Sequence, residues 1–337
     1  MALKMSSSIY PTMASLELRR VSFLSHPGTG AQGMLVVDDR TLGPPVIALR
    51  VGLHGDERHA LQEAGRLARA MTLRASLAGL DHGGAALLVQ DRPTMDRARA
   101  FEWLGGELSD LARSWVIGDR GATRLDMRAL EQGGARVDME PDLRRESMAR
   151  GVVRGLQHLA QRRERRLEEC CVAVQGAGPE GEAVAALLSA MGCELVIADP
   201  DARRAREVAD RLGAQMVPAH GIWSASKELL APCAAGGLIG PKTAPQIEAF
   251  GICGTATHQV VDLETAQALQ DRGILHVPGV LSTAGSLPAH PSERAPALSD
   301  ETLLSTIEDI LDEAEATGRP PSQLVDERAW ERIELSG

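Results

Sequence analysis

Lysine is nearly missing from this sequence. It occurs three times in 337 residues, at Lys4, Lys227 and Lys242, so arginine supplies almost all of the positive charge. An arginine side chain has a pKa above about 12 and does not exchange protons near neutrality. The shortage therefore limits the proton-transfer chemistry that the chain can perform.

Aromatic side chains are also scarce. They make up 2% of the residues, with one tyrosine and three phenylalanines, so stacking platforms for single-stranded nucleic acids are not expected. The formal net charge is −10 and the isoelectric point is near 5.5, which excludes a general nucleic-acid or anionic-membrane surface. We expect neither nucleic acid nor a membrane among the partners.

The cysteines are few and show no pattern. There are five, at Cys170, Cys171, Cys193, Cys233 and Cys253, without a CxxC spacing. This favours a reducing compartment and neither a disulfide framework nor a zinc cluster, so no metal is expected. The sequence holds no apolar run of about 18 residues that could span a membrane. The stretch Met1–Arg20 lacks the apolar core of a secretory signal, and we therefore expect a cytoplasmic protein.

What the chain does contain is enough apolar sequence for two cores. Hydrophobic residues make up 44% and charged residues 24%, the balance of a soluble globular protein. A length of 337 residues exceeds one ordinary core and predicts two domains. In the first part of the chain, hydrophobic spacing predicts strands over Gly33–Val37, Pro45–Val51 and Ala85–Val89, and helices over Asp56–Met71 and Asp96–Ala112.

A long amphipathic helix is expected over Pro141–Glu169, and the hydrophobic spacing changes after it. Strands and helices then alternate, a pattern that builds a parallel sheet with helices on both faces. The predicted strands are Cys171–Gln175, Glu194–Ala198 and segments near Leu229–Leu230, Gly251–Ile252 and Ile274–Leu275; the predicted helices are Glu182–Met191, Ala202–Leu212, Asp300–Thr317 and Gln323–Leu335. The predicted fold class is therefore α/β with two domains.

Three glycines indicate a dinucleotide-binding turn. Gly176, Gly178 and Gly181 follow a predicted strand and open a predicted helix, the context that a GxGxxG pattern requires. The first glycine permits the tight turn, the second lets a pyrophosphate approach the backbone, and the third lets helix and strand pack closely. N–H groups at the start of the helix would face the phosphates. A glycine turn without a nucleotide is the alternative.

Asp199 supports nucleotide binding and favours NAD. It ends the second predicted strand, about 20 residues beyond the glycines, where an acidic residue binds the ribose hydroxyls of adenosine. Its charge would repel a 2′-phosphate, so the expected cofactor is NAD and not NADP. Arg203 and Arg204 lie close by and act in the opposite direction, and Glu180 adds a negative charge near the pyrophosphate.

Five motifs in chain order resemble the leucine dehydrogenase branch of the glutamate, leucine, phenylalanine and valine dehydrogenases: Asp39–Pro44, Arg69–Thr72, Ala78–Gly84, Val174–Gly178 and Ala231–Ala234. The resemblance runs from about Gly30 to Ile333. It implies a substrate and oligomerisation domain over residues 1–140, to which a last helix (about 318–337) returns, and a Rossmann NAD-binding domain over residues 141–317. It also implies a homo-oligomer that converts an L-amino acid to a 2-oxo acid by oxidative deamination, and the reverse reaction.

The resemblance is strong for the scaffold and poor for the chemistry. The lysine that binds the substrate carboxylate in the family aligns with Arg74, and arginine can still hold a carboxylate. The lysine that activates the attacking water aligns with Ala86, which has no donor, acceptor or titratable group. The catalytic aspartate aligns with Asp119 and is kept.

Further departures surround the expected substrate and nicotinamide. A glycine pair of the family becomes Ile47–Ala48, and a threonine beside the nicotinamide becomes Met148. The asparagine of an Asn-Gln pair becomes His258, followed by Gln259, and a further asparagine becomes Thr283. The resemblance nevertheless places His258 on the nicotinamide side of the cofactor site.

Three more residues are candidates. His82 lies next to Asp81, just before the glycine pair that precedes Ala86, and an imidazole with a pKa near 6.5 can act as an acid or a base in place of the lysine. An ordinary turn histidine is the alternative. The resemblance also places Cys233 and Ala234 at the cofactor, and the Cys233 thiol itself is interpreted as buried packing.

Three functions remain open. The first is an NAD-dependent amino-acid dehydrogenase or a close variant, with Arg74 holding the carboxylate of an amino acid, 2-oxo acid or imine. The second is a catalytically silent dinucleotide-binding homologue that acts as a sensor or partner subunit. The third is an enzyme of another class on the same frame, in which His82 or Asp119 has a new role.

Overall fold

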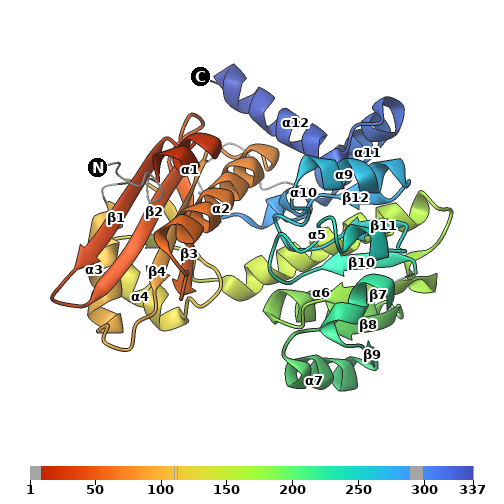
Figure 1. Cartoon of the computed structure of the whole chain (residues 1–337), viewed down its shortest axis with the longest axis horizontal. Coiled ribbons are helices and arrows are strands. Elements are labelled where there is room, and N and C mark those ends of the chain that lie inside the picture. Colours follow the sequence, from red (N-terminus) through yellow and green to blue (C-terminus); the bar gives the residue numbers. More distant parts are fainter. Residues whose placement is uncertain (1–8, 110, 112, 226, 289–298, 337) are drawn as a thin grey trace, which may run out of the picture. The chain divides into compact units, whose positions relative to one another are not determined.

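The computed structural model describes residues 9–109, 111, 113–225, 227–288 and 299–336 (Figure 1). Lys4, the start of the stretch Met1–Arg20 and the end of the predicted helix at Ala112 lie outside the described residues. The α-helices are α1 Tyr10–Ser15, α2 Glu57–Leu77, α3 Arg97–Ser109, α4 Arg124–Gln132, α5 Pro141–Gln161, α6 Pro179–Ala190, α7 Ala202–Leu212, α8 Ile222–Ala225, α9 Leu263–Asp271, α10 Gly279–Ser282, α11 Asp300–Thr317 and α12 Pro321–Ser336.

The first sheet is mixed and follows the order β1-β2-β4-β3-β5-β6. Its strands are β1 Arg20–His26, β2 Ala31–Asp39, β3 Pro45–Gly52, β4 Gly83–Gln90, β5 Trp115–Gly118 and β6 Arg136–Val137. β2 pairs antiparallel with both β1 and β4, and the other neighbours are parallel. The strands expected over Gly33–Val37, Pro45–Val51 and Ala85–Val89 are confirmed.

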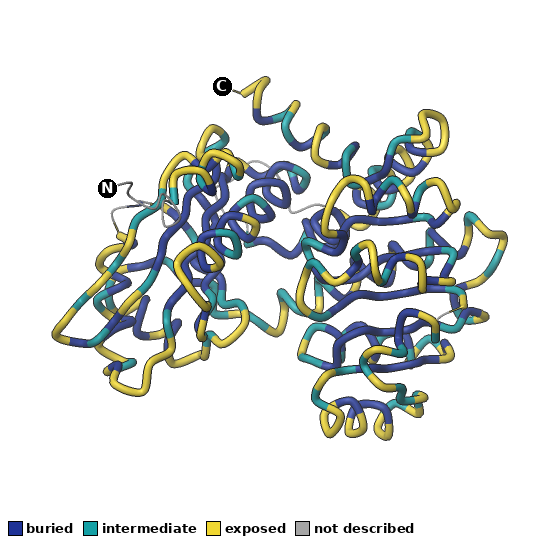
Figure 2. Tube along the Cα trace, in the orientation of Figure 1, coloured by how far each residue is buried: buried dark blue, intermediate teal, exposed yellow. Residues whose placement is uncertain are grey.

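The two faces of this sheet carry different helices. Leu49 and Leu87 belong to an apolar core that they share with residues of α3 and α4. Figure 2 shows that the central strands of the sheet are mostly buried. The opposite face packs against α2 so closely that a Cβ added at Gly84 would lie 2.2 Å from the backbone nitrogen of Thr72. Because alternate residues of a strand point to opposite faces, Ala86 lies under α2 together with Gly84.

Helix α2 is built as its sequence predicts. The Asp56 side chain caps it by accepting a hydrogen bond from the backbone nitrogen of His59. Leu61, Ala64 and Ala68 recur at helical spacing and are 0% exposed, so this stripe faces the sheet. The helix extends beyond the predicted end at Met71 to Leu77, because buried residues on it continue to pack against the sheet.

Arg332 of α12 closes the turn that follows α2. Its Nη1 donates to the carbonyl oxygen of Leu80 at 2.8 Å, and its Nη2 donates to Gly79 O at 3.1 Å and to Asp81 Oδ1 at 2.9 Å. The turn leads directly into β4. The last helix therefore fastens the chain at the point where that strand begins.

The second sheet is entirely parallel, in the order β12-β11-β10-β7-β8-β9. Its strands are β7 Cys171–Gln175, β8 Glu194–Ala198, β9 Gln215–Met216, β10 Leu229–Pro232, β11 Gly251–Cys253 and β12 Leu275–Val277. The chain builds the sheet outward from β7 to β9 and then returns to the other side of β7 with β10. Ligands of such sheets bind at this switch point, beyond the carboxyl ends of the strands.

Two helix ends differ from the sequence predictions. Helix α5 ends at Gln161 and not at Glu169, because Glu164 adopts a left-handed φ of 55° and the chain turns toward β7. Helix α6 begins at Pro179, earlier than the predicted Glu182, since proline is well suited to a first helical turn. Nine of the α-helices and strands have no counterpart among the predicted helices and strands: β1, β5, β6, β9, α1, α4, α8, α9 and α10.

The chain folds into two compact units. The first contains the described residues up to Pro141 and those from Arg332 onward, and the second contains the described residues between Asp142 and Glu331. Each unit holds one of the two sheets. Within the described residues, no helix combines the length and apolar character needed to cross a membrane.

Candidate functional site

The turn after β7 has the backbone that the glycine pattern predicts. Gly176 has a φ of +102°, and a Cβ added there would lie 2.9 Å from the backbone nitrogen of Ala234. A Cβ at Gly181 would lie 1.9 Å from the carbonyl oxygen of Gly176. Both positions require glycine, because a side chain at position 176 would overlap Ala234 and one at position 181 would overlap the backbone of Gly176.

Gly178 leaves space for a ligand. It is the N-cap of the 12-residue helix α6, no side chain caps that helix, and a Cβ added at Gly178 would meet no atom within 4 Å. Uncapped N–H groups at the start of a helix attract anions. The turn therefore fits the pyrophosphate of a dinucleotide.

Asp199 braces this turn from the end of β8. Its Oδ2 accepts a hydrogen bond from the backbone nitrogen of Ala177 at 2.8 Å, and its Oδ1 accepts one from Asp201 at 2.8 Å. Each carboxylate oxygen has a further lone pair, so a ribose hydroxyl could still donate to it. Arg204 Nη1 lies 4.0 Å from Oδ2. The predicted position of Asp199 at the end of the strand is confirmed. The sequence did not predict that its side chain would also hold the turn.

Cys233 and Ala234 follow β10, on the other side of the switch point. The backbone nitrogen of Cys233 donates to Gln175 O at 2.7 Å. Burial raises the pKa of the Cys233 thiol to about 11, so the thiol is a packing group, as its interpretation from sequence holds. Ala234 contributes its backbone to the wall against which Gly176 is packed.

His258 lies on a turn that its neighbours hold firmly. Its carbonyl oxygen accepts a hydrogen bond from the backbone nitrogen of Gly237. The buried amide of Gln259 donates to Gly254 O at 3.0 Å and accepts from His276 Nε2 at 2.6 Å. Burial lowers the pKa of His276 to about 4, so the ring is neutral at physiological pH. Gln259 thus fixes the turn that carries His258.

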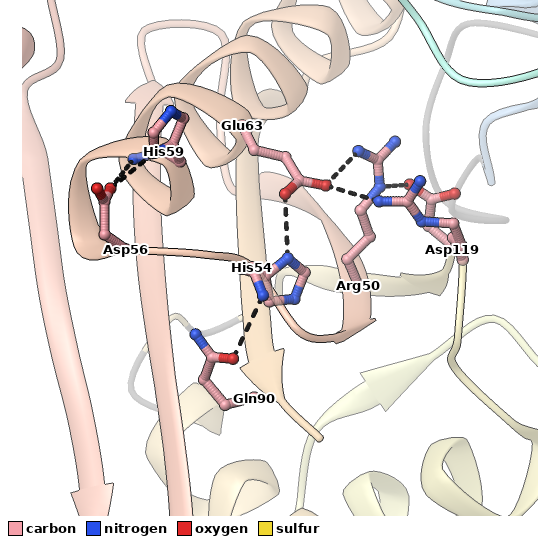
Figure 3. Close-up of polar contacts among 8 residues, drawn as sticks. Arg50, His54, Asp56, His59, Glu63, Gln90 and Asp119 are labelled. Carbon is pink, nitrogen blue, oxygen red and sulfur yellow. Dashed lines mark hydrogen bonds and ion pairs between the residues drawn. The ribbon is translucent and has the colours of Figure 1, made fainter. Parts of the chain in front are cut away.

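In the first unit, Asp119 is paired with Arg50 (Figure 3). Arg50 lies on β3, and Asp119 directly follows β5, the neighbouring strand. Arg50 Nε donates to Asp119 Oδ2 at 2.7 Å. The side chain of Asp119 is 32% exposed, and the described residues offer no hydrogen-bond donor to its Oδ1. One carboxylate oxygen is held and the other is open.

Glu63 of α2 anchors Arg50 from the opposite side (Figure 3). Its Oε1 accepts from Arg50 Nη1 at 2.9 Å and from Arg120 Nη2 at 3.0 Å, and its Oε2 lies 3.0 Å from His54 Nδ1. Burial by itself would raise the pKa of Glu63, but the hydrogen bonds from Arg50 and His54 lower it. We call Arg50, His54, Glu63, Asp119 and Arg120 the Arg50 cluster.

A second ion pair holds the loop after Asp119. Arg97 Nε and Nη2 donate to the two carboxylate oxygens of Asp126 at 2.7 and 2.8 Å. Arg97 Nη2 also donates to Gly121 O at 3.0 Å, within the loop. Asp126 forms a capping box with Thr123 at the start of α4. Asp119 therefore lies on a loop whose backbone is fixed at both ends.

Apolar packing fills the position of the expected lysine. Ala86 is 0% exposed and pairs with Val36 on β2 and with Ala48 on β3, which are also buried. Of the lysines that the structure describes, Lys227 and Lys242 both belong to the second unit. The described part of the first unit therefore has no ammonium side chain.

The other two predicted catalytic residues are buried. Arg74 and His82 are each 3% exposed. Arg74 Nη1 lies 3.8 Å from the sulfur of Met71, and His82 Nδ1 lies 2.8 Å from Pro44 O. Within the described residues, the side chain of Asp119 bonds to Arg50 and to neither of them.

Sequence reasoning named Asp119 but missed the other four residues of the Arg50 cluster. A signal was present, because Arg50 is the charged residue in the otherwise apolar segment Pro45–Val51. A charge inside a buried strand needs a partner, and Glu63 on the following helix is an acid within reach. The partnership with Asp119 depends on the pairing of β3 with β5 and could not be read from spacing.

Comparison with known proteins agrees with this architecture, although no family model matches the chain. The chain is 28% identical to a leucine dehydrogenase of Geobacillus stearothermophilus over 343 residues, 97% of this chain and 93% of that protein. The crystal structure of L-tryptophan dehydrogenase from Nostoc punctiforme superposes with a TM-score of 0.75 at 26% identity, covering 97% of this chain and 99% of that one. Hetero-hexameric glutamate dehydrogenase from Thermus thermophilus, in a Leu-bound form, shares the fold with a TM-score of 0.75 at 22% identity, over 100% and 98% of the two chains.

Proposed function

Because the chain is a homologue of the leucine and tryptophan dehydrogenases, we propose that it is an oxidoreductase that binds NAD in preference to NADP. We assign the cofactor to the second unit and a small amino, imino or oxo acid to the first. When bound, the nicotinamide supplies or accepts the hydride. The protein's residues position the reactants and the charges around them.

The glycine turn is the observation that carries the proposal. Gly176 and Gly181 exclude side chains by close contact within the protein, whereas Gly178 faces open space at an uncapped helix start. A helix start with space and free N–H groups is suited to a pyrophosphate. The carboxylate of Asp199 favours a ribose with a free 2′-hydroxyl, because a 2′-phosphate would meet a like charge.

In the first unit, we assign the substrate carboxylate to Arg74 and the reacting nitrogen to Asp119. Arg50 holds Asp119 by a bond of 2.7 Å, and Arg97 fixes the loop that carries it. A carboxylate held in this way is positioned before substrate arrives, which is what effective catalysis requires.

The test is a titration of the purified protein with NADH and with NADPH, followed by fluorescence. We expect NADH to bind more tightly than NADPH. Oxidation of NADH is then measured with imino acids and with 2-oxo acids plus ammonium. Absence of NADH binding would refute the proposal, and tighter binding of NADPH would refute the choice of NAD.

A second function is supported by the packing around Ala86. The row formed by Val36, Ala86 and Ala48 is fully buried and carries no group that could move a proton. This favours a dinucleotide-binding homologue without turnover, acting as a sensor or as a partner subunit. Tight NADH binding without oxidation by any of these substrates would distinguish this function from the first.

A further inference from the structure

Asp119 presents one open carboxylate oxygen. Its Oδ2 is held by Arg50 Nε at 2.7 Å, whereas Oδ1 accepts no hydrogen bond from any residue that the structure describes. The side chain is 32% exposed. A cationic N–H donor is the best match for such an open carboxylate oxygen.

The rest of the Arg50 cluster has no proton to give a substrate. Arg50 and Arg120 carry guanidinium groups, which do not deprotonate in proteins. Glu63 uses both of its oxygens as acceptors. His54 is 6% exposed, its Nδ1 lies 3.0 Å from Glu63 Oε2, and its Nε2 is buried and makes no hydrogen bond to any residue that the structure describes.

The two other candidate positions do not supply a proton to Asp119 either. Ala86 has no titratable group. His82 is buried with its Nδ1 at Pro44 O, and it makes no hydrogen bond to Asp119. The described part of the first unit therefore binds positive charge at Asp119 without offering an acid beside it.

This combination distinguishes two reductions. To form an amine from a 2-oxo acid and ammonia, nitrogen must add to the carbonyl and water must leave, which requires repeated proton transfer by an acid–base group. Reduction of a protonated, preformed imine requires a hydride alone. The hydride forms the new C–H bond, the C=N π pair becomes the nitrogen lone pair, and NADH is oxidised to NAD. The resulting amine takes its proton from solvent.

We infer that the substrate is a preformed 2-imino acid, bound as a cation with its N–H on Oδ1 of Asp119, and that free ammonia is not a substrate. The inference rests on the proposed oxidoreductase function and specifies its substrate class. Cyclic imino acids and N-alkyl imino acids both meet this description.

The first experiment compares two substrates with the full-length protein and NADH. One is 1-piperideine-2-carboxylate, a cyclic imino acid, and the other is 4-methyl-2-oxopentanoate with ammonium chloride. We expect kcat/KM for the cyclic imino acid to exceed that for the oxo acid at least 100-fold, on the order of the loss expected when an acid–base group is missing. Comparable values would overturn the inference and leave the oxidoreductase function standing.

The second experiment measures binding without turnover. L-Pipecolate, a cyclic secondary ammonium acid, and cyclohexanecarboxylate, which lacks the nitrogen, are titrated by calorimetry into the NADH complex. We expect pipecolate to bind more tightly, and D119N to weaken its binding by about 10- to 100-fold, the value of a charged hydrogen bond. D271N, an exposed aspartate at the end of α9, is the matched control and should bind like the wild type.

The outcomes separate the inference from the proposed function. If NADH does not bind, both are refuted. If NADH binds but D119N binds pipecolate as tightly as the wild type, only the assignment of the cation to Asp119 is refuted. If NADH and pipecolate both bind and the imino acid is not reduced, the substrate class is refuted; the oxidoreductase function is refuted as well only if the 2-oxo acid with ammonium does not oxidise NADH either.

Discussion

Arg50 Nε lies 2.7 Å from Asp119 Oδ2, and this bond joins two residues that are 69 positions apart in the sequence. The same guanidinium donates from Nη1 to Glu63. Burial opposes the charge on Arg50, but the carboxylates of Asp119 and Glu63 outweigh it and raise the pKa of Arg50. Arg50 therefore places a permanent positive charge beside Asp119.

Substituting the two glycines of the turn separates folding from cofactor binding. G181A should destabilise the protein by about 1–3 kcal/mol, because the new Cβ would overlap Gly176 O. G178A meets only open space and should change stability by less than about 0.5 kcal/mol. The same methyl group should weaken NADH binding on the order of tenfold, since it occupies the path of the pyrophosphate. Thermal melts and NADH titrations check both, and normal binding by G178A would contradict the predicted cofactor position.

Glu63 should make the free energy of unfolding depend on pH in the acidic range. Its pKa is lowered in the folded protein, so its contribution is complete above its ordinary pKa near 4.5 and is lost as the pH falls through the lower folded value. E63Q should therefore be less stable at pH 7 by about 1–2 kcal/mol and should lose less stability on acidification. Urea titrations over this pH range measure both effects. E131Q, an exposed position on α4, serves as the control, and an unchanged acid dependence in E63Q would refute the role of Glu63.

The stability of the loop that carries Asp119 should require arginine at position 97, and a positive charge alone should not be enough. R97K retains the charge but cannot donate to both oxygens of Asp126 and to Gly121 O together. We expect a loss of about 1–2 kcal/mol in stability, with a larger fall in kcat than in substrate affinity, because the loop carrying Asp119 is loosened. R99K on the exposed side of α3 is the matched control. Equal effects of the two substitutions would show that the bidentate pair is unimportant.

Placing lysine at position 86 tests the prediction, made from the family resemblance, that this position corresponds to a catalytic lysine. A86K should raise activity with 2-oxo acids and ammonium, because an ammonium group can cycle protons where arginine cannot. It should also cost about 1–3 kcal/mol in stability, because the position is 0% exposed and closely packed. A86M, of similar length and without charge, should carry the cost without the gain. If A86K gains no activity, the site has diverged beyond this one position.

Strand β1 should take part in self-association. It is the outermost strand of the first sheet, and Phe23 on it is 55% exposed. An edge strand with an exposed apolar side chain is suited to contact with a second copy of the chain. We expect the wild type to be a homo-oligomer by light scattering and F23K to have a lower mass. A monomeric wild type would contradict this.

The parts of the fold that the sequence predicts well are those in which local pattern and long-range packing agree. The run Cys171–Gln175, the glycine turn and the helix after it form one unit whose requirements lie within a short stretch. Strand β1 was not predicted because it lies at the edge of the sheet. Its residues are therefore exposed or half-buried, and polar residues interrupt the apolar ones. The end of α5 escaped because Glu164, a residue without turn preference, adopts the left-handed conformation.

The candidate site shows the same division. Asp199 could be placed from its distance to the glycines, because both belong to consecutive elements of one βαβ unit. The partnership of Arg50, Glu63 and Asp119 requires knowing that β3 lies next to β5 and beneath α2, and no local pattern records that arrangement. The sequence only predicts that Ala86 takes the place of a lysine, and its burial in an apolar row is visible only in the structure.

The three hydrogen bonds of Arg332 connect the carboxyl-terminal helix to a turn that lies about 250 positions earlier in the sequence. A protease that trims the last helix ahead of this residue would cut contacts with carbonyls up to 253 positions upstream. Shortening the protein at its carboxyl terminus should therefore first disturb the turn that leads into β4, in the first unit.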